Sequence, residues 1–285
     1  MNRSVRAVTA KETLEILERG SYLSPSGRVV RIDSDVRAAL DGTRLYRPAD
    51  FPEGIEGCGP VPERGGVEVE VTPETSLQAA RRLALGASRP DVLCLNFASA
   101  KNPGGGFLSG SQAQEESLAR SSALYASLTS RPEMYEFNRR VGTCLYSDHM
   151  IYSPRVPVFR DDEGRLLEEP YRVSFITAPA VNAGAVRRNE RNDAGAILPT
   201  MRRRLGRVLW VAALQGHTAL VLGAWGCGVF RNEPAEVARL FAEALGPGGP
   251  FRECFRQIVY AVYDKSPGEE VLSAFRGALA EGAEG

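Results

Sequence analysis

Two adjacent glutamates follow a run of three glycines, and this spacing could support acid–base chemistry. The glycines are Gly104, Gly105 and Gly106, and the acidic pair is Glu115 and Glu116. Successive side chains on a helix diverge by about 100°, so one carboxylate can enter a pocket while the other turns toward the rim. The pair therefore offers one catalytic carboxylate and one group that orients a ligand. The alternative is that both charges only complement the positive end of a helix.

A second glycine-rich segment, AWGCGVFRNEP, covers residues 224–234 and follows an apolar run that predicts a buried strand. Ligands of open α/β sheets bind beyond the carboxyl ends of the strands. Backbone N–H groups in such loops favour phosphate oxygens. Neither loop matches the P-loop pattern GxxxxGK[ST], and Arg231 stands where GxGxxG requires its third glycine, which disfavours a nicotinamide cofactor. The alternative is that each loop is only a tight turn.

Few other groups are available for catalysis. The two histidines, His149 and His217, exclude HExxH zinc sites and histidine-rich metal clusters, and we expect both to be structural or solvated. We expect no metal and no cofactor. The 35 basic residues balance 35 acidic ones, so no global field holds a long polyanion. The basic segments 187–191 and 201–207 are predicted to be solvated faces, and we expect no direct nucleic-acid partner.

The sequence also predicts no membrane partner. It contains no run of 18 apolar residues, and its N-terminus lacks the apolar core of a secretory signal. The five cysteines are scattered without a CxxC pair, so we expect reduced, mostly buried thiols. These features together predict a cytoplasmic protein, and we expect it to be a monomer.

Strand and helix patterns alternate from residue 67 onward, which predicts an α/β fold with a mostly parallel sheet covered on both faces. Thr9 and Glu12 predict a capping box for an N-terminal helix, whereas residues 42–66 are rich in Gly and Pro and predict a loop. Two prolines in residues 150–159 indicate an edge strand or an extended loop. The other predicted strands are 28–33, 67–71, 91–97, 173–180, 218–225 and 256–263, and the other helices are 72–85, 114–128, 132–141, 193–215, 233–245 and 268–281.

The segment GGGFLSGSQAQEE, residues 104–116, resembles the hallmark of the poly(ADP-ribose) glycohydrolases, in which three glycines and a spacer precede QEE. The segments NFASAKNP, VSFITAPAVNAG and AWGCGVFRNEP are similar to the bacterial-type branch of that family. The resemblance covers most of the chain. It implies a macrodomain-like three-layer α/β/α sandwich, with a mostly parallel mixed sheet and an N-terminal helical extension. We expect residues 1–65 to form the accessory segment and residues 66–285 the catalytic domain.

The resemblance also implies roles for individual residues. Glu116 matches the catalytic general acid/base of the family, and Glu115 matches the neighbour that contacts the ribose and orients the scissile bond. Phe230 is expected to pack against a ribose ring, and topology makes residues 264–267 a candidate for the adenosine side. The implied substrate-binding residues are Asn102, Gly104, Gly105, Gly106 and Gln114 in the first loop and helix start, and Gly226, Cys227, Gly228, Val229 and Phe230 in the diphosphate loop.

The activity implied by the resemblance is hydrolysis of the ribose–ribose O-glycosidic bonds of poly(ADP-ribose). The balanced charge predicts cleavage mainly from chain ends, with release of ADP-ribose. ADP-ribosylated proteins would carry the substrate, and the DNA damage response would be the setting. Two alternatives stay open: a non-catalytic reader of ADP-ribose, and a hydrolase of ADP-ribose attached to protein side chains.

Overall fold

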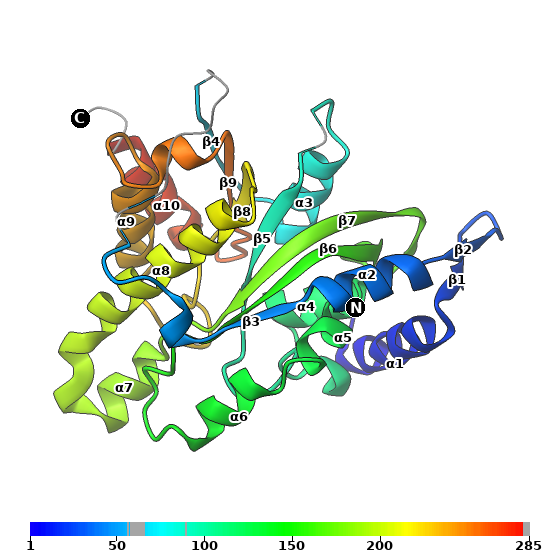
Figure 1. Ribbon diagram of the computed structural model, residues 1–285, viewed down its shortest axis with the longest axis horizontal. Coiled ribbons are helices and arrows are strands. Elements are labelled where there is room, and N and C mark those ends of the chain that lie inside the picture. Colours follow the sequence, from blue (N-terminus) through cyan, green and yellow to red (C-terminus); the bar gives the residue numbers. More distant parts are fainter. Residues whose placement is uncertain (56, 58–65, 89, 282–285) are drawn as a thin grey trace.

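A mixed sheet forms the centre of the protein in a computed structural model, which describes residues 1–55, 57, 66–88 and 90–281. Over these residues the sheet has seven strands in the order β3-β6-β7-β5-β8-β9-β4 (Figure 1). The strands from β7 to β4 run parallel, and β6 and β3 join antiparallel at one side. The strands are β3 (Arg44–Tyr46), β4 (Glu68–Thr72), β5 (Val92–Phe97), β6 (Met150–Arg160), β7 (Leu166–Ala178), β8 (Ala219–Leu222) and β9 (Gln257–Ala261), and a separate hairpin pairs β1 (Ser21–Leu23) with β2 (Val29–Arg31).

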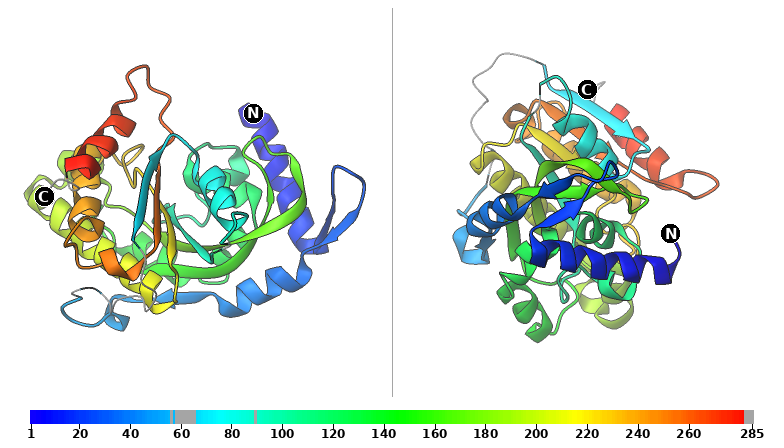
Figure 2. Two further views of the ribbon diagram at one scale, coloured as in Figure 1. Left: turned by 90° about the horizontal axis from the view of Figure 1, so that it is seen from above. Right: turned by 90° about the vertical axis from the view of Figure 1, so that its right-hand side faces the viewer.

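Helices cover both faces of this sheet (Figure 2). The alternation of strand side chains explains the two layers, because Val92 and Cys94 of β5 enter one apolar core while Leu93 and Leu95 enter the other. The predicted three-layer α/β/α sandwich is therefore confirmed. One face carries α7 (Ala183–Asn189), α8 (Ile197–Leu214), α9 (Pro234–Leu245) and α10 (Glu270–Glu281), and the other carries α1 (Arg3–Arg19), α2 (Asp33–Gly42), α3 (Ser76–Ala84), α4 (Gln114–Ser121), α5 (Leu124–Thr129) and α6 (Glu133–Arg140).

The N-terminal helix begins earlier than its sequence pattern predicts. The side chain of Asn2 caps α1 by accepting the N–H of Val5 at 2.9 Å. The predicted capping box at Thr9 and Glu12 is wrong, because Thr9 lies inside the helix and donates its hydroxyl to the carbonyl of Val5. Glu12 instead reaches the buried guanidinium of Arg160 at 3.2 Å.

The strand β6 is interior at its start, where Met150–Tyr152 pair with β3, so the predicted edge position is wrong for these residues. It pairs with β7 on one side and with β3 on the other. The sheet accommodates Pro154 because the register shifts between Ser153 and Val156, a bulge that takes the proline out of the ladder. The strand β3 itself lies inside residues 42–66, which were predicted to be loop, and its three residues are too few to show an alternating pattern.

Two further expectations concern the chain as a whole. The boundary expected between residues 65 and 66 adjoins residues 58–65, which lie outside the described residues, so the domain division stays a prediction. Cys254 is disulfide-bonded, whereas Cys94, Cys144 and Cys227 are free. The expectation of reduced cysteines is thus wrong for Cys254, because sequence spacing does not show which thiols meet in space. Within the described chain, no helix combines the length and apolar character needed to cross a bilayer.

Candidate active site

Glu115 is the buried member of the carboxylate pair in the first turn of α4. Its side chain is 2% exposed and accepts the N–H of Ser99 at 2.7 Å and the amide of Asn96 at 3.3 Å. Burial raises the pKa of Glu115 to about 8, the Ser99 N–H opposes this rise, and the charge of Glu116 adds to it. Glu115 therefore keeps its proton at neutral pH. The sequence analysis did not single out Asn96 as a contact of Glu115, although a single polar residue inside the apolar run of β5 was its signal.

Glu116 is only half-buried and turns toward the first glycine-rich loop. Its Oε1 accepts the N–H of Gly106 at 3.0 Å, and its second oxygen accepts no hydrogen bond from the described residues. Gly105 lies between the two carboxylates with φ +59°. A Cβ at this position would stand 2.5 Å from Glu116 Oε1 and 3.2 Å from Glu115 Oε2. Both carboxylates thus converge on the backbone of Gly105, and any side chain there would displace them.

The other glycines of the triplet are packed against protein atoms. A Cβ at Gly104 would meet the ring of Tyr125 at 3.0 Å, and one at Gly106 would meet Ser111 Oγ at 2.5 Å. Gln114 is also engaged within the protein: its side-chain oxygen accepts the N–H of Phe97, and its amide donates to Ser76 Oγ and the carbonyl of Leu95. These bonds fix the start of α4 to the end of β5.

The second glycine-rich loop is anchored at the carboxyl end of β7. The indole of Trp225 donates to the carbonyl of Ala178 at 3.0 Å, and the Asn232 amide donates to the carbonyl of Val181 at 2.8 Å. Gly226 has φ +77°, and a Cβ there would clash with Ala180 and Asn232. The loop therefore has a fixed path that depends on glycine at position 226.

The middle of this loop presents its backbone outward. Within the described chain, the N–H groups of Gly228, Val229 and Phe230 donate to no protein acceptor. Val229 is 84% exposed, and no atom lies within 4 Å of a Cβ built on Gly228. Consecutive free N–H groups of this kind attract anionic oxygens. Burial raises the pKa of Cys227 to about 12, so its thiol stays protonated.

The sheet brings the two loops to the same edge. The first loop begins after Phe97, whose register partner in β7 is Ala178, the residue to which the second loop is anchored. The second loop begins near Gly223, where a Cβ would lie 3.2 Å from the ring of Phe97. The two loops thus begin next to each other, and the substrate contacts of the predicted site residues, including Asn102 and Gln114, stay predictions.

Several polar residues have structural rather than catalytic surroundings. His149 bonds to Ser147 Oγ through Nδ1 at 2.9 Å, and the ring nitrogens of His217 bond to the hydroxyl of Tyr152 and the carbonyl of Asp91. In the candidate adenosine segment 264–267, the carboxylate of Asp264 accepts the N–H groups of Ser266 and Val271 at the start of α10. A contact of this segment with adenosine stays a prediction.

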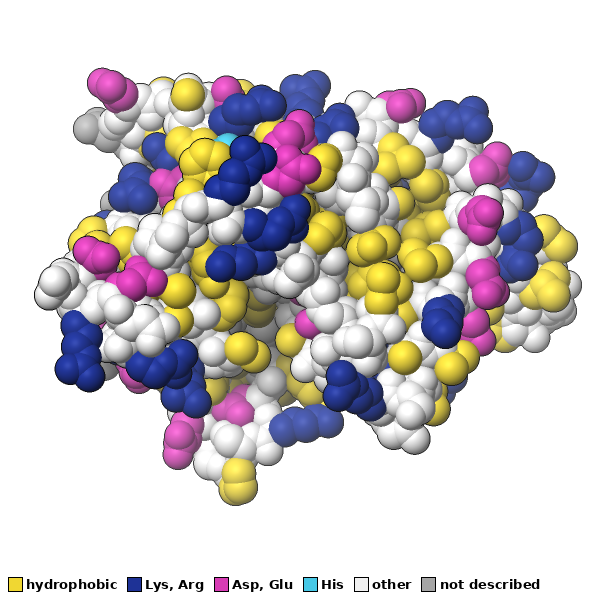
Figure 3. Space-filling model, turned by 90° about the horizontal axis from the view of Figure 1, so that it is seen from below, with side chains coloured by type: hydrophobic (Ala, Val, Ile, Leu, Met, Phe, Trp, Pro, Cys, Tyr) yellow, Lys and Arg dark blue, Asp and Glu magenta, His cyan; other side chains and the backbone are white. Residues whose placement is uncertain are grey.

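The basic segment 201–207 is only partly solvated. Arg203, Arg204 and Arg207 all bond to the buried carboxylate of Asp148, and Arg204 has no exposed surface. The predicted solvated face is wrong for Arg204, because a buried acid from a distant segment packs against this helix. On the face shown in Figure 3, Lys and Arg side chains lie among Asp and Glu side chains, and several of the basic ones are next to one another in the upper middle of the view.

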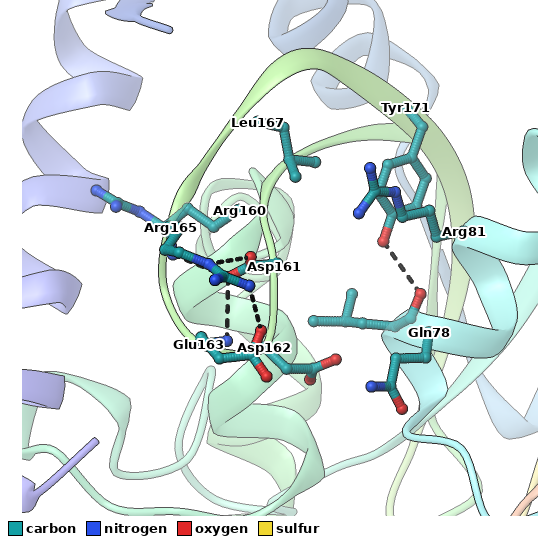
Figure 4. Close-up of a pocket in the computed structure, with 10 residues that line it drawn as sticks. Gln78, Arg81, Arg160, Asp161, Asp162, Glu163, Arg165, Leu167 and Tyr171 are labelled. Atoms are coloured by element: carbon teal, nitrogen blue, oxygen red, sulfur yellow. Dashed lines mark hydrogen bonds and ion pairs between the residues drawn. The ribbon is translucent and has the colours of Figure 1, made fainter. Parts of the chain in front are cut away.

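A further cavity lies between α3 and the hairpin of β6 and β7 (Figure 4). Three of its charged groups pair with one another, because Arg165 contacts Asp161 at 2.8 Å and Glu163 at 3.2 Å. The hydroxyl of Tyr171 donates to the carbonyl of Leu77. No predicted site residue lines this cavity, so it is separate from the candidate site.

Comparison with known proteins identifies the family. Residues 10–161 match the family described as the catalytic domain of microbial-type poly(ADP-ribose) glycohydrolase. This chain belongs to the microbial-type poly(ADP-ribose) glycohydrolase family. The matched residues include the three glycines and the two glutamates of the first motif. The resemblance inferred from the sequence is therefore confirmed. No curated protein sequence matches the chain significantly.

Solved structures of this glycohydrolase family match the chain over nearly its whole length. The enzyme from Thermomonospora curvata is 54% identical with a TM-score of 0.92, and the match covers 97% of this chain and 100% of that chain. The same enzyme bound to the inhibitor ADP-HPD gives 54% identity and a TM-score of 0.89, covering 96% and 99%. The Deinococcus radiodurans enzyme in complex with ADP-ribose is 48% identical with a TM-score of 0.78, covering 88% and 99%.

Proposed function

We propose that this chain hydrolyses the ribose–ribose O-glycosidic bonds of poly(ADP-ribose), with Glu116 as the general acid/base. The observation that carries this proposal is the unequal placement of the two carboxylates. Glu115 is buried and accepts hydrogen bonds on both oxygens, whereas Glu116 is half-buried and keeps one oxygen available. Glu116 is therefore the carboxylate that can reach a bound glycosidic bond. Membership of the glycohydrolase family supports the same assignment.

The mechanism uses one carboxylate in two steps. Protonated Glu116 donates its proton to the leaving 2′-oxygen, and the departing bond leaves an oxocarbenium-like ribose. The Glu116 carboxylate then removes a proton from a water that attacks the anomeric carbon, which restores the acid and completes the hydrolysis. Glu115 orients the ribose, and its own carboxyl stays protonated up to about pH 8.

The diphosphate of the substrate would bind at the second loop. The free N–H groups of Gly228, Val229 and Phe230 support this placement, and Gly226 and Cys227 set the path of the loop. Phe230 would pack against the ribose. The bound ADP-ribose and ADP-HPD of the relatives are consistent with a ligand of this class. Asn102 would contact the ribose from the first loop.

Finer features of the function belong to the same proposal. The core, residues 66–285, would be macrodomain-like, with residues 1–65 as its accessory segment. The enzyme would act as a monomer in the cytoplasm, in the response to DNA damage, on polymer carried by ADP-ribosylated proteins. Cleavage would proceed mainly from chain ends, because a net charge of zero gives no global electrostatic field that would hold a long polyanion.

The test is to incubate the purified protein with protein-bound poly(ADP-ribose) and, separately, with a mono-ADP-ribosylated protein. We expect free ADP-ribose as the main early product from the polymer and little release from the second substrate. Binding without release would favour a non-catalytic reader, and release mainly from the second substrate would favour a side-chain ADP-ribosyl hydrolase. Long internal fragments early in digestion would contradict cleavage from chain ends.

A further inference from the structure

The loop between α6 and β6 carries a tyrosine in an unusual backbone conformation. Tyr146 has φ +57°, in the left-handed region that bulky residues rarely adopt. Such a conformation persists only where the surrounding structure imposes it, and residues of this kind cluster at functional sites. The contacts around Tyr146 therefore indicate the role of this conformation.

A fully buried arginine holds this loop in place. The guanidinium of Arg204 donates to the carbonyls of Leu145 at 2.9 Å and Tyr146 at 3.2 Å, and also to the carbonyl of Pro179 just after β7. Its Nε bonds to the buried carboxylate of Asp148 at 2.8 Å. Burying a charged pair is costly unless it is fully bonded, and here the bonds attach the loop to the edge of the sheet where the two glycine-rich loops lie.

The short helix α7 connects the same loop to the second glycine-rich loop. At its start, the N–H of Asn182 donates to the carbonyl of Cys144 at 3.0 Å, and at its end Glu190 accepts the Cys144 N–H at 2.8 Å. Between them, the N–H of Gly184 donates to the carbonyl of Phe230 at 2.9 Å. One helix thus fixes both loops at a set separation.

The result of these contacts is an aromatic pair. The ring centroids of Tyr146 and Phe230 lie 5.9 Å apart at an interplanar angle of 48°. Asn182, whose side chain caps the start of α7 by accepting the N–H of Ala185 at 3.1 Å, lies near the Tyr146 side chain. Tyr146 is half-exposed, so its ring forms part of the surface beside the free N–H groups of the second loop.

We propose that Tyr146 is a positioning residue that holds the Phe230 ring in the orientation needed to pack against the ribose next to the diphosphate. The inference rests on the proposed function, because it assigns Phe230 to ADP-ribose binding. Tyr146 acts through Phe230 rather than on the reacting bond. Removing the Tyr146 ring therefore weakens substrate affinity more than it lowers the rate of the chemical step.

The glycine substitution Tyr146→Gly provides the test, because glycine suits the left-handed backbone while the ring is removed. We expect thermal stability close to wild type, ADP-ribose affinity and KM for the polymer weakened about fivefold to tenfold, and kcat changed less than about threefold. Tyr146→Phe keeps the ring and should restore affinity. Arg155→Gly is the matched control, since Arg155 also has positive φ (+45°). Its N–H donates to Ser174 Oγ of β7, opposite the amino end of β5.

A double variant tests whether Tyr146 acts through Phe230. If it does, Tyr146→Gly combined with Phe230→Ala should bind ADP-ribose no more weakly than Phe230→Ala alone. Additive losses overturn the inference, and so does a wild-type affinity for Tyr146→Gly in an otherwise active enzyme. A wild-type protein that neither binds ADP-ribose nor cleaves the polymer overturns the proposed function itself. If Tyr146→Gly unfolds, Tyr146→Asn serves the same purpose, because asparagine also tolerates the left-handed region.

Discussion

The two glycine-rich loops use glycine for different purposes. In the first loop, Gly105 leaves room for the carboxylates of Glu115 and Glu116, which accept N–H groups of the protein itself. In the second loop, Gly226 adopts φ +77°, and the three N–H groups that follow Cys227 have no protein acceptor within the described part of the chain. Under the proposed function, the first loop would therefore serve the chemistry and the second loop would bind the diphosphate. Substitutions in the two loops should therefore affect different constants.

Among substitutions in the two loops, the largest effect should come from the first loop. In Gly105→Ala the added methyl group must displace the Glu116 carboxylate, and φ +59° adds strain. We expect the rate of polymer cleavage to fall on the order of 10²-fold, because misplacing a catalytic group by about 1 Å can cost that much. Steady-state kinetics measure the effect, and Gly195→Ala, in open surroundings, is the matched control. A rate near wild type would show that the space at Gly105 is not needed for the carboxylates.

A smaller effect, on binding, should come from the second loop. Gly228 has open space around it and no positive φ, so Gly228→Val should leave the melting temperature unchanged. The branched side chain would stand where the diphosphate approaches, and we expect ADP-ribose affinity to weaken about tenfold, or about 1.4 kcal/mol. Calorimetry measures the change against Gly195→Val. Unchanged affinity would place the diphosphate elsewhere.

The smallest effect should be on stability and should depend on pH. The pKa of Glu115 is about 8 in the folded protein against 4.5 for an ordinary glutamate, so folding binds a proton between these values. Its contribution to stability is complete below about pH 4.5 and is lost as pH rises through 8. Glu115→Gln has no carboxyl that titrates at this position, so its stability should not show this loss at high pH. Its melting temperature relative to wild type should therefore rise between pH 5 and pH 9, on the order of 5 °C. A pH-independent difference would contradict the raised pKa.

Much of this architecture could be predicted from the sequence. Continuous apolar runs predicted the buried strands β5 and β8, and the QEE motif predicted that two glutamates begin a helix beside a glycine loop. The short strand β3 could not be predicted, because three residues carry no period. Arg204 looked like part of a solvated basic helix, and only the fold shows that Asp148 lies against it.

The roles of Asn96 and Tyr146 depend in the same way on tertiary contacts. Asn96 reaches Glu115 across 19 positions in the chain, and Tyr146 meets Phe230 across a much longer interval. Local sequence patterns reflect hydrophobic periodicity and turn chemistry. They predict where a helix, strand or turn lies, but not which residues it contacts in the fold. The sequence motif therefore predicted where the two carboxylates lie, at the start of a helix, whereas the residues that contact them and fix the loops were found only in the structure.

The most direct measurement for the central claim is the activity and ligand affinity of Glu116→Gln. The substitution keeps the size of the side chain but removes its ability to exchange a proton. We expect the rate of polymer cleavage to fall about 10²- to 10⁴-fold, the usual range for general acid–base catalysis. We also expect the affinity for ADP-ribose to stay within about threefold of wild type, a change of less than about 1 kcal/mol. Turnover near the wild-type rate would contradict the assignment of Glu116 as the catalytic carboxylate.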